Sequence, residues 1–139
     1  TSVIVFGAGG VGIAAIQGAR IAGAAEIVAV DLVDSKLEMA KKFGATHAVK
    51  PQDVDGIKND VTAGEGFDYA LECIGNPATI RGAFDAIRRG GTAVIVGVGR
   101  MEQMVQFSAF ELFFPHLPMS NDDLRLRHEP LKEVPNRKD

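Results

Sequence analysis

The sequence predicts an α/β fold in which helices cover both faces of a doubly wound parallel sheet. Short apolar runs of strand type alternate along the chain with helix-like segments, which is the pattern of strands joined by helical crossovers. Glycines and an Asn-Pro pair stand at several of the boundaries between these segments. The alternation covers residues 1–114 of the 139 and provides about five strands, so we expect one domain there.

The first half of the chain supplies three of these strands. They are predicted at Val3–Phe6, Glu26–Asp31 and His47–Val49. An alanine-rich helix from about Gly10 to Ala22 joins the first two and stops at Gly23. Asp34 and Ser35 are N-cap candidates for the next helix, which continues through Phe43.

The second half supplies the fourth and fifth strands, at 66–72 and 92–96. A weakly periodic segment from Asp53 to about Thr62 predicts a helix before the fourth strand. Asn76-Pro77 predicts a helix start, with an Asn cap and Pro at the first helical position. That helix is expected to continue to about Arg89 and to end at the Gly90-Gly91 pair.

The pattern fails after the fifth strand. Residues 108–114 predict a short apolar helix, and no further strand-like run follows it. Residues 115–139 hold four of the six prolines and many mixed charges, so we expect an irregular tail there.

The composition points to an ordinary globular protein of the cytoplasm. Hydrophobic residues make up 46% and charged residues 24%, and the net charge of −3 favours neither nucleic acid nor an anionic membrane as partner. The single cysteine, Cys73, cannot form an internal disulfide, which fits a reducing compartment. No apolar stretch is long enough to cross a bilayer, and only two residues precede the first strand, so no signal peptide is expected.

A glycine turn directly after the first strand predicts a dinucleotide site. Gly7, Gly9 and Gly12 have the spacing G-x-G-x-x-G, and Asp31 closes the second strand. The first glycine allows the turn, the second lets the backbone approach the phosphates, and the third lets the helix lie close on the strand. The N–H groups and positive dipole end of the helix would face the pyrophosphate. This is the site of a Rossmann fold.

Asp31 also predicts which dinucleotide binds. Its carboxylate can accept both hydroxyls of the adenosine ribose through charge-assisted hydrogen bonds of about 1.5–3 kcal/mol. A 2′-phosphate would meet a like charge, and at ~4 Å with an effective dielectric of ~20 the repulsion is about 4 kcal/mol per charge pair. No arginine lies between Asp31 and Lys36 to offset it. We therefore expect NAD rather than NADP.

Two other functions remain open on these residues. An S-adenosylmethionine methyltransferase also has a glycine turn after its first strand and an acid at the end of its second. The full G-x-G-x-x-G spacing and the later Val-Ile-Val-Gly-Val block weigh against it. A stand-alone nucleotide-binding or interaction module without catalysis is the other alternative.

Five blocks, in order, resemble the coenzyme domain of the zinc-dependent medium-chain alcohol dehydrogenases. They are VIVFGAGGVG, VAVD, KKFGATH, FDYALECIGN and GGTAVIVGV, and the resemblance covers residues 1–114. Within that family the chain is most similar to the class III or nitrosodimethylaniline-dependent branch. The resemblance implies hydride transfer between an alcohol and NAD as the reaction of the parent enzyme.

The resemblance also implies a role for individual positions. The residues facing the pyrophosphate would be Gly7, Gly9, Gly10, Val11 and Gly12. Asp31 and Lys36 would lie at the adenosine ribose, with Leu32 and Thr79 bordering the adenine. The path to the nicotinamide would be lined by Ile74, Gly75, Val96, Gly97 and Val98.

Other parts of that family's enzymes do not occur in the sequence. The zinc ligands and proton relay lie in a separate catalytic domain, and no Cys/His cluster here has metal-ligand spacing, so we expect no metal site and no alcohol oxidation by this chain alone. A sixth strand is replaced by Pro115-His116-Leu117-Pro118. The fifth strand would then be an open edge, and with the apolar segment Phe107–Phe114 it predicts self-association.

Overall fold

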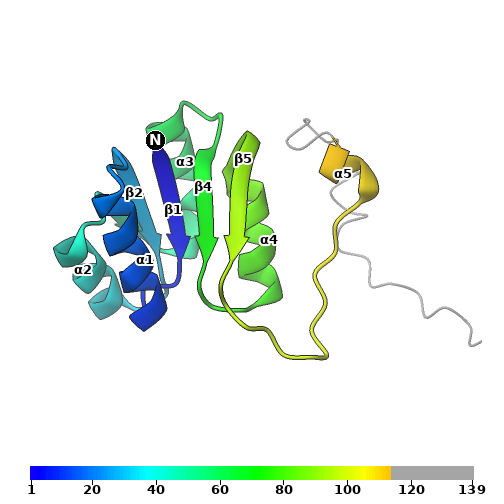
Figure 1. The fold of residues 1–139 in the computed structure, drawn as a ribbon, viewed down its shortest axis with the longest axis horizontal. Helices are drawn as coiled ribbons and strands as arrows, with labels where there is room; N and C mark the ends of the chain where they lie inside the picture. Colours follow the sequence, from blue (N-terminus) through cyan, green and yellow to red (C-terminus); the bar gives the residue numbers. More distant parts are fainter. Residues whose placement is uncertain (114–139) are drawn as a thin grey trace, which may run out of the picture.

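The computed structural model describes residues 1–113 and confirms the predicted α/β class. Five parallel strands form one sheet in the order β3-β2-β1-β4-β5 (Figure 1). The strands are β1 (Ser2–Phe6), β2 (Glu26–Val30), β3 (His47–Val49), β4 (Phe67–Glu72) and β5 (Ile87–Ile95). The helices are α1 (Gly10–Ile21), α2 (Asp34–Phe43), the 3-10 turn η1 (Pro51–Asp53), α3 (Val54–Thr62), α4 (Pro77–Ala86) and α5 (Ala109–Phe113).

The alternation of side chains along the strands builds two separate cores. Val3 and Val5 of β1 face α1 and α2, where they pack with Ile16 and Ala40. Residues one position along the strands face α3 and α4 and form the second core, which contains Ile4, Phe6, Val28, Phe67, Ala83 and Ala86. Because both faces of the central strands are buried, the strands read as continuous apolar runs.

The strand order determines where a ligand can lie. From β1 the chain winds outward through β2 to β3, then crosses back to β4 on the other side of β1 and continues to β5. Loops leaving β1 and β4 therefore diverge at the carboxyl edge of the sheet. Such a topological switch point is where open α/β sheets bind ligands.

The boundary between α4 and β5 corrects the sequence-based prediction. The helix was expected to reach about Arg89 and end at Gly90-Gly91, but it ends at Ala86 and β5 begins at Ile87. Ile87 is buried in the second core and pairs with Phe67, and the Nε of Arg88 donates to Asp68 at 2.6 Å. These tertiary contacts override a local sequence that could continue as a helix.

The start of α2 is a second correction. Asp34 and Ser35 were the expected caps, but Val33 occupies the N-cap position and no side chain caps this helix. The Val33 N–H donates to Oδ1 of Asp31 at 2.9 Å, so the turn is held from the end of β2. The predicted cap at Asn76 is confirmed, since its side chain accepts from the Ala78 N–H.

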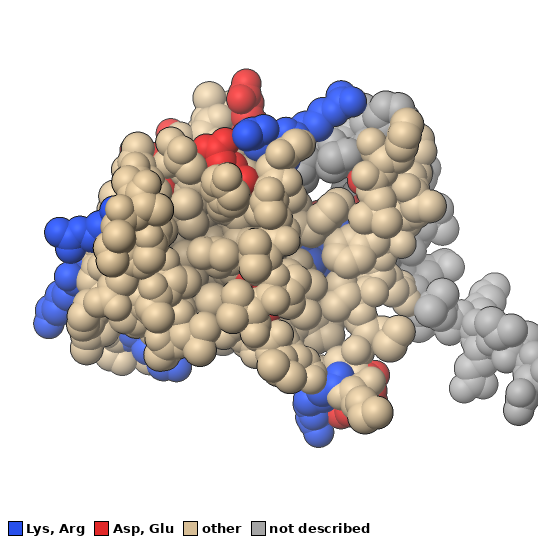
Figure 2. All heavy atoms as spheres, viewed as in Figure 1, with Lys and Arg blue, Asp and Glu red and all other residues tan. Residues whose placement is uncertain are grey.

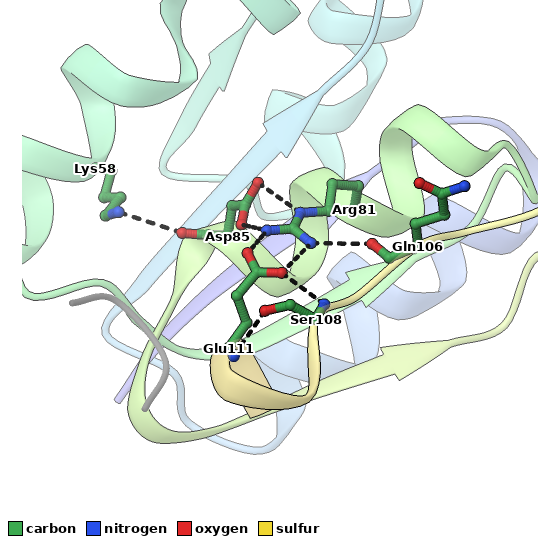
Figure 3. A network of polar contacts seen from close by, with 6 residues as sticks. All are labelled: Lys58, Arg81, Asp85, Gln106, Ser108 and Glu111. Atoms are coloured by element: carbon green, nitrogen blue, oxygen red, sulfur yellow. Dashed lines mark hydrogen bonds and ion pairs between the residues drawn. The ribbon is translucent and has the colours of Figure 1, made fainter. Parts of the chain in front are cut away.

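A polar network anchors α5 to α4 (Figure 3). The Arg81 guanidinium on α4 pairs with the buried carboxylate of Glu111 and with Asp85, and it donates to the Gln106 carbonyl at 3.1 Å. Lys58 of α3 donates to the Asp85 carbonyl at 3.2 Å. The bond to Glu111 raises the pKa of Arg81 further above its ordinary value. The guanidinium therefore joins α4 to α5, and the Lys58 bond to Asp85 adds α3 to the network.

The short helix α5 has its own start signal, in agreement with the helix predicted at 108–114. Ser108 Oγ accepts from the Glu111 N–H at 3.0 Å, and the Glu111 carboxylate accepts from the Ser108 N–H at 2.9 Å, which makes a capping box. Phe107 packs edge-to-face on Phe84, with Arg81 over both rings. Phe107 is thus part of a cluster on α4, whereas Phe114 and the tail predicted at 115–139 lie outside the described residues.

Within residues 1–113, no helix covers β4 and β5 on the face of the sheet that α1 and α2 share. Tyr69 and Val94 lie on that face of β4 and β5 and are 46% and 40% exposed, and Val96 just beyond β5 is 47% exposed. In Figure 1 α4 lies behind these strands and α1 lies over β1 and β2. In the matching view of Figure 2 the charged side chains gather at the rim of the molecule and the middle is uncharged.

Candidate functional site

The glycine turn between β1 and α1 has the geometry that its spacing predicts. Gly7 has φ +97°, a value that side-chain-bearing residues rarely adopt, so it makes the turn. A Cβ on Gly12 would lie 1.7 Å from the Gly7 carbonyl oxygen. Glycine at position 12 therefore lets α1 pass directly over the end of β1.

Gly9 and Gly10 differ from these two because no atom of residues 1–113 lies where a side chain would begin. A Cβ at either position would meet no atom within 4 Å, and Gly9 has an ordinary φ of −78°. Both residues are exposed at the N-terminus of α1, whose first intrahelical bond runs from the Ile13 N–H to the Gly9 carbonyl. The N–H groups of the first helical turn have no partner within the helix, so an anion could bind the backbone there.

Asp31 links the glycine turn to the turn after β2. Its Oδ2 accepts from the Ala8 N–H and its Oδ1 from the Val33 N–H, both at 2.9 Å. The carboxylate is therefore held in place, and each oxygen keeps a second lone pair for a ligand hydroxyl. Half-buried at the carboxyl end of β2, it stands where the sequence predicts a ribose contact.

A pocket of about 560 Å³ opens beside Asp31, within the range of small-molecule sites. It lies between the end of β2, the segment containing η1 and the start of α3, and one side of α4. Its lining is largely apolar, with carboxylates at Asp31, Asp55 and Asp85 and an ammonium at Lys36. The other lining residues are Phe6, Val30, Leu32, Val33, Pro51, Val54, Ile74, Ala78, Thr79, Gly82 and Ala86.

The predicted adenosine residues meet in this pocket. Asp31, Leu32, Lys36 and Thr79 all line it, as does Ile74, which was expected on the nicotinamide path. Lys36 is exposed and forms no ion pair with any residue of 1–113, although Lys50 and Asp34 pair nearby at 3.1 Å.

The remaining predicted residues lie outside the pocket lining. Those of the glycine turn are Gly7, Gly9, Gly10, Val11 and Gly12, and those of the loops after β4 and β5 are Gly75, Val96, Gly97 and Val98. The two loops are in direct contact, since a Cβ on Gly97 would lie 2.1 Å from the Gly75 nitrogen. The roles of these residues in coenzyme binding stay predictions.

Sequence reasoning missed Glu72, the last residue of β4. Its side chain is fully buried, and Oε1 accepts from the N–H groups of Ile74 at 2.9 Å and Gly75 at 2.7 Å and lies 2.9 Å from the Thr79 hydroxyl. The sequence did contain a signal for this residue: an acid stands at the end of β4, just as Asp31 stands directly after β2. Burial, and secondarily the Glu72 carboxylate, raise the pKa of the Cys73 thiol, so this cysteine is a weak nucleophile.

Residues 1–113 contain neither a metal-ligand cluster nor a membrane-spanning helix. Within this range no three His, Cys, Asp or Glu side chains gather closely enough to hold a metal ion. Among the helices described, none combines the length and apolar character needed to span a bilayer.

Comparison with known proteins agrees with this geometry. The model of the zinc-binding dehydrogenase family matches residues 10–128. The S-(hydroxymethyl)glutathione dehydrogenase of Synechocystis is 43% identical over 115 residues, which are 80% of this chain and 31% of that protein. The class-3 alcohol dehydrogenase of Caenorhabditis elegans is 42% identical over 120 residues, covering 81% of this chain and 31% of its own length.

Solved structures give the same result. Benzyl alcohol dehydrogenase from Acinetobacter calcoaceticus superposes with a TM-score of 0.75 at 36% identity, over 81% of this chain and 32% of that one. A Sinorhizobium meliloti protein described as a zinc-binding dehydrogenase, solved bound to NADP, has a TM-score of 0.76 at 30% identity, over 82% and 34%. The chain thus spans about a third of the length of the relatives that it matches.

Proposed function

The chain belongs to the zinc-binding dehydrogenase family as its NAD(P)-binding domain, and from this premise we propose that it binds NAD in preference to NADP. Asp31 carries the proposal. A 2′-phosphate beside this carboxylate would meet a like charge, and the bonds from the Ala8 and Val33 N–H groups prevent the carboxylate from turning away. The NADP seen in the Sinorhizobium meliloti structure belongs to that protein, so the choice of coenzyme here rests on the residue at position 31.

In this proposal the coenzyme lies across the switch point between β1 and β4. The pyrophosphate takes the open space over Gly9 and Gly10 at the start of α1. The adenosine takes the pocket beside Asp31, where Leu32 and Ile74 offer apolar surface. The nicotinamide extends toward the loops after β4 and β5 and supplies the hydride-accepting carbon. This chain's part is to bind and orient the coenzyme.

We propose that the parent reaction is hydride transfer between an alcohol and NAD, and that this chain alone does not perform it. The relatives are about three times as long as the stretch they share with this chain. The family resemblance implies that the segment that would polarise the alcohol oxygen lies in the part that is not shared. Alcohol oxidation by the purified chain with NAD and zinc would contradict this part of the proposal.

Calorimetric titration of the purified 139-residue chain tests the binding function. NAD should bind, NADP should bind far more weakly, and S-adenosylmethionine should not bind. Binding of S-adenosylmethionine alone would favour the methyltransferase alternative. Binding of none of the three would favour an interaction module without a nucleotide.

We further propose that the chain self-associates through the outer edge of β5 and the apolar face beside it. Within residues 1–113, β5 pairs with β4 alone, and Tyr69, Val94 and Val96 leave apolar area exposed next to that edge. Light scattering at micromolar concentration should give a dimer or larger species. Val94→Lys should shift the protein to a monomer, and a wild-type monomer would contradict the proposal.

We propose a cytoplasmic location because Cys73 is a free thiol. The thiol is half-buried and is the only cysteine in the sequence, so the fold gains nothing from an oxidising compartment. Fractionation of the source cells, followed by immunoblotting, would test this location.

A further inference from the structure

The carboxylate of Glu72 is the most unusual polar group in the described part of the chain. It is fully buried, and its Oε2 has no hydrogen-bond partner within residues 1–113. Buried polar atoms are nearly always bonded, and a half-bonded buried acid is costly. Such a costly residue is expected to have a function, and the bonds of its other oxygen indicate which one.

The other oxygen, Oε1, bonds the loop that leads from β4 to α4. It accepts from two consecutive N–H groups, those of Ile74 and Gly75, and it also accepts from the Thr79 hydroxyl in the first turn of α4. Two adjacent amides that point at one oxygen fix the peptide planes on both sides. Because the N–H and C=O of a trans peptide point in opposite directions, the carbonyls of Cys73 and Ile74 point away from Oε1.

The main chain of Glu72 bonds the second loop in the same way. Its carbonyl accepts from the N–H groups of Val96 at 2.8 Å and Gly97 at 2.9 Å. The two loops also touch each other, because a Cβ on Gly75 would lie 2.3 Å from the Val98 carbonyl oxygen. One residue therefore bonds both loops that are expected to line the nicotinamide path.

We propose that Glu72 is a positioning residue for the nicotinamide half of the coenzyme site. It contacts no coenzyme atom. Its carboxylate acts by holding the backbone of 74–75, against which the loop of 96–98 packs, in the orientation that binds the nicotinamide carboxamide. The proposal rests on the coenzyme function proposed above. Asp31, Leu32 and Lys36 line the adenosine pocket and form no bond with Glu72, whereas Ile74 and Thr79 line the pocket and are bonded by it. Loss of the carboxylate should therefore weaken the nicotinamide half of the site more than the adenosine half.

Paired titrations with NADH and ADP-ribose test this role, because ADP-ribose lacks the nicotinamide. Glu72→Ala removes all the side-chain bonds, and Glu72→Asp keeps the charge but draws the oxygens away from the loop. In both variants NADH should bind at least tenfold more weakly, while ADP-ribose, which Asp31 still holds, should weaken by less than about threefold. Glu72→Gln keeps an acceptor for the two N–H groups and should restore NADH binding to within about threefold of wild type.

Glu26→Ala is the matched control, because it removes a glutamate at the opposite, amino end of β2. Both titrations should be unchanged in this variant. Should Glu72→Ala fail to fold by circular dichroism, Glu72→Asp and Glu72→Gln still decide the outcome. Equal weakening of both ligands, an unchanged ratio in Glu72→Asp, or a glutamine variant as weak as the aspartate variant would overturn the positioning role. Failure of wild type to bind either ligand would instead overturn the coenzyme function itself.

Discussion

Replacing Asp31 by Asn should remove the preference for NAD over NADP. In the wild type both carboxylate oxygens accept bonds from N–H groups at 2.9 Å, so the side chain cannot turn away from a 2′-phosphate bound beside it. The residue is half-buried, which makes an effective dielectric of ~20 appropriate and gives a repulsion of about 4 kcal/mol at ~4 Å. Since 1.4 kcal/mol is a factor of ten, wild type should prefer NAD by about a thousandfold.

The variant changes both sides of this preference. Asn cannot repel the phosphate, so the ratio of the NADP and NAD dissociation constants should fall by two to three orders of magnitude, on the order of the full repulsion. NAD binding itself should weaken at least tenfold, because charge-assisted bonds of about 1.5–3 kcal/mol to the ribose become neutral ones.

Isothermal titration of both coenzymes measures this ratio directly. Asp34→Asn is the matched control, because it removes the same charge three residues away from a side chain that is 83% exposed and paired with Lys50. The control should keep the wild-type ratio, and thermal unfolding should show both variants folded. Comparable wild-type affinity for the two coenzymes, or an Asp31→Asn ratio equal to wild type, would refute the reasoning.

Three further predictions test the turn, the α5 anchor and the acid side of the stability curve. Gly12→Ala places a Cβ 1.7 Å from a carbonyl oxygen and should destabilise the fold by about 3 kcal/mol or more. Gly9→Ala places a Cβ where no atom lies within 4 Å, so it should keep the melting temperature but bind NAD tenfold more weakly. A Gly9→Ala variant less stable than Gly12→Ala would contradict this reasoning. Arg81→Met removes the guanidinium that anchors α5, so hydrogen exchange in residues 105–113 should accelerate while the sheet stays protected, and unchanged exchange would disprove the anchor. The bonded Arg88 guanidinium holds the pKa of Asp68 below its usual range, so the stability from this carboxylate is present above about pH 4 and is lost as pH falls through the lowered pKa. In Asp68→Asn, the free energy of unfolding measured in urea should therefore fall less steeply as pH drops below about 4. The same pH dependence as wild type would count against this role.

Local sequence signals were sufficient for most of the fold. β1 and β2 are short apolar runs that are buried on both faces, so their sequence leaves little ambiguity, and the turn at Gly7–Gly12 is fixed by steric rules that apply to any protein. The Asn76-Pro77 start was predicted correctly for the same reason, since a cap depends on residues that are adjacent in the chain.

The misses arose where distant residues decide the conformation. The end of α4 depends on Ile87 entering a core and on Arg88 reaching Asp68, twenty residues earlier in the chain. The N-cap of α2 was displaced because Asp31 already bonds the Val33 N–H. Neither pairing can be found from local propensity.

Some residues of the candidate site could likewise be located from the sequence, and one could not. Asp31, Leu32, Lys36 and Thr79 could be placed because the ends of parallel strands and the helices after them meet at one edge of a sheet. Glu72 could not, because its importance depends on which N–H groups its side chain reaches, and those contacts exist only in the folded chain.

The contact between Gly75 and Gly97 also constrains which sequences this site can have. A side chain at position 97 would strike the backbone nitrogen at 75, and one at 75 would strike the backbone of Val98. Because the obstructing atoms are main chain, no change of a neighbouring side chain can make room. In a library randomised at both positions, functional clones should hold glycine at both, and no double substitution should rescue either single one. Positions 75 and 97 therefore constrain each other's substitutions, although more than twenty residues separate them in the chain.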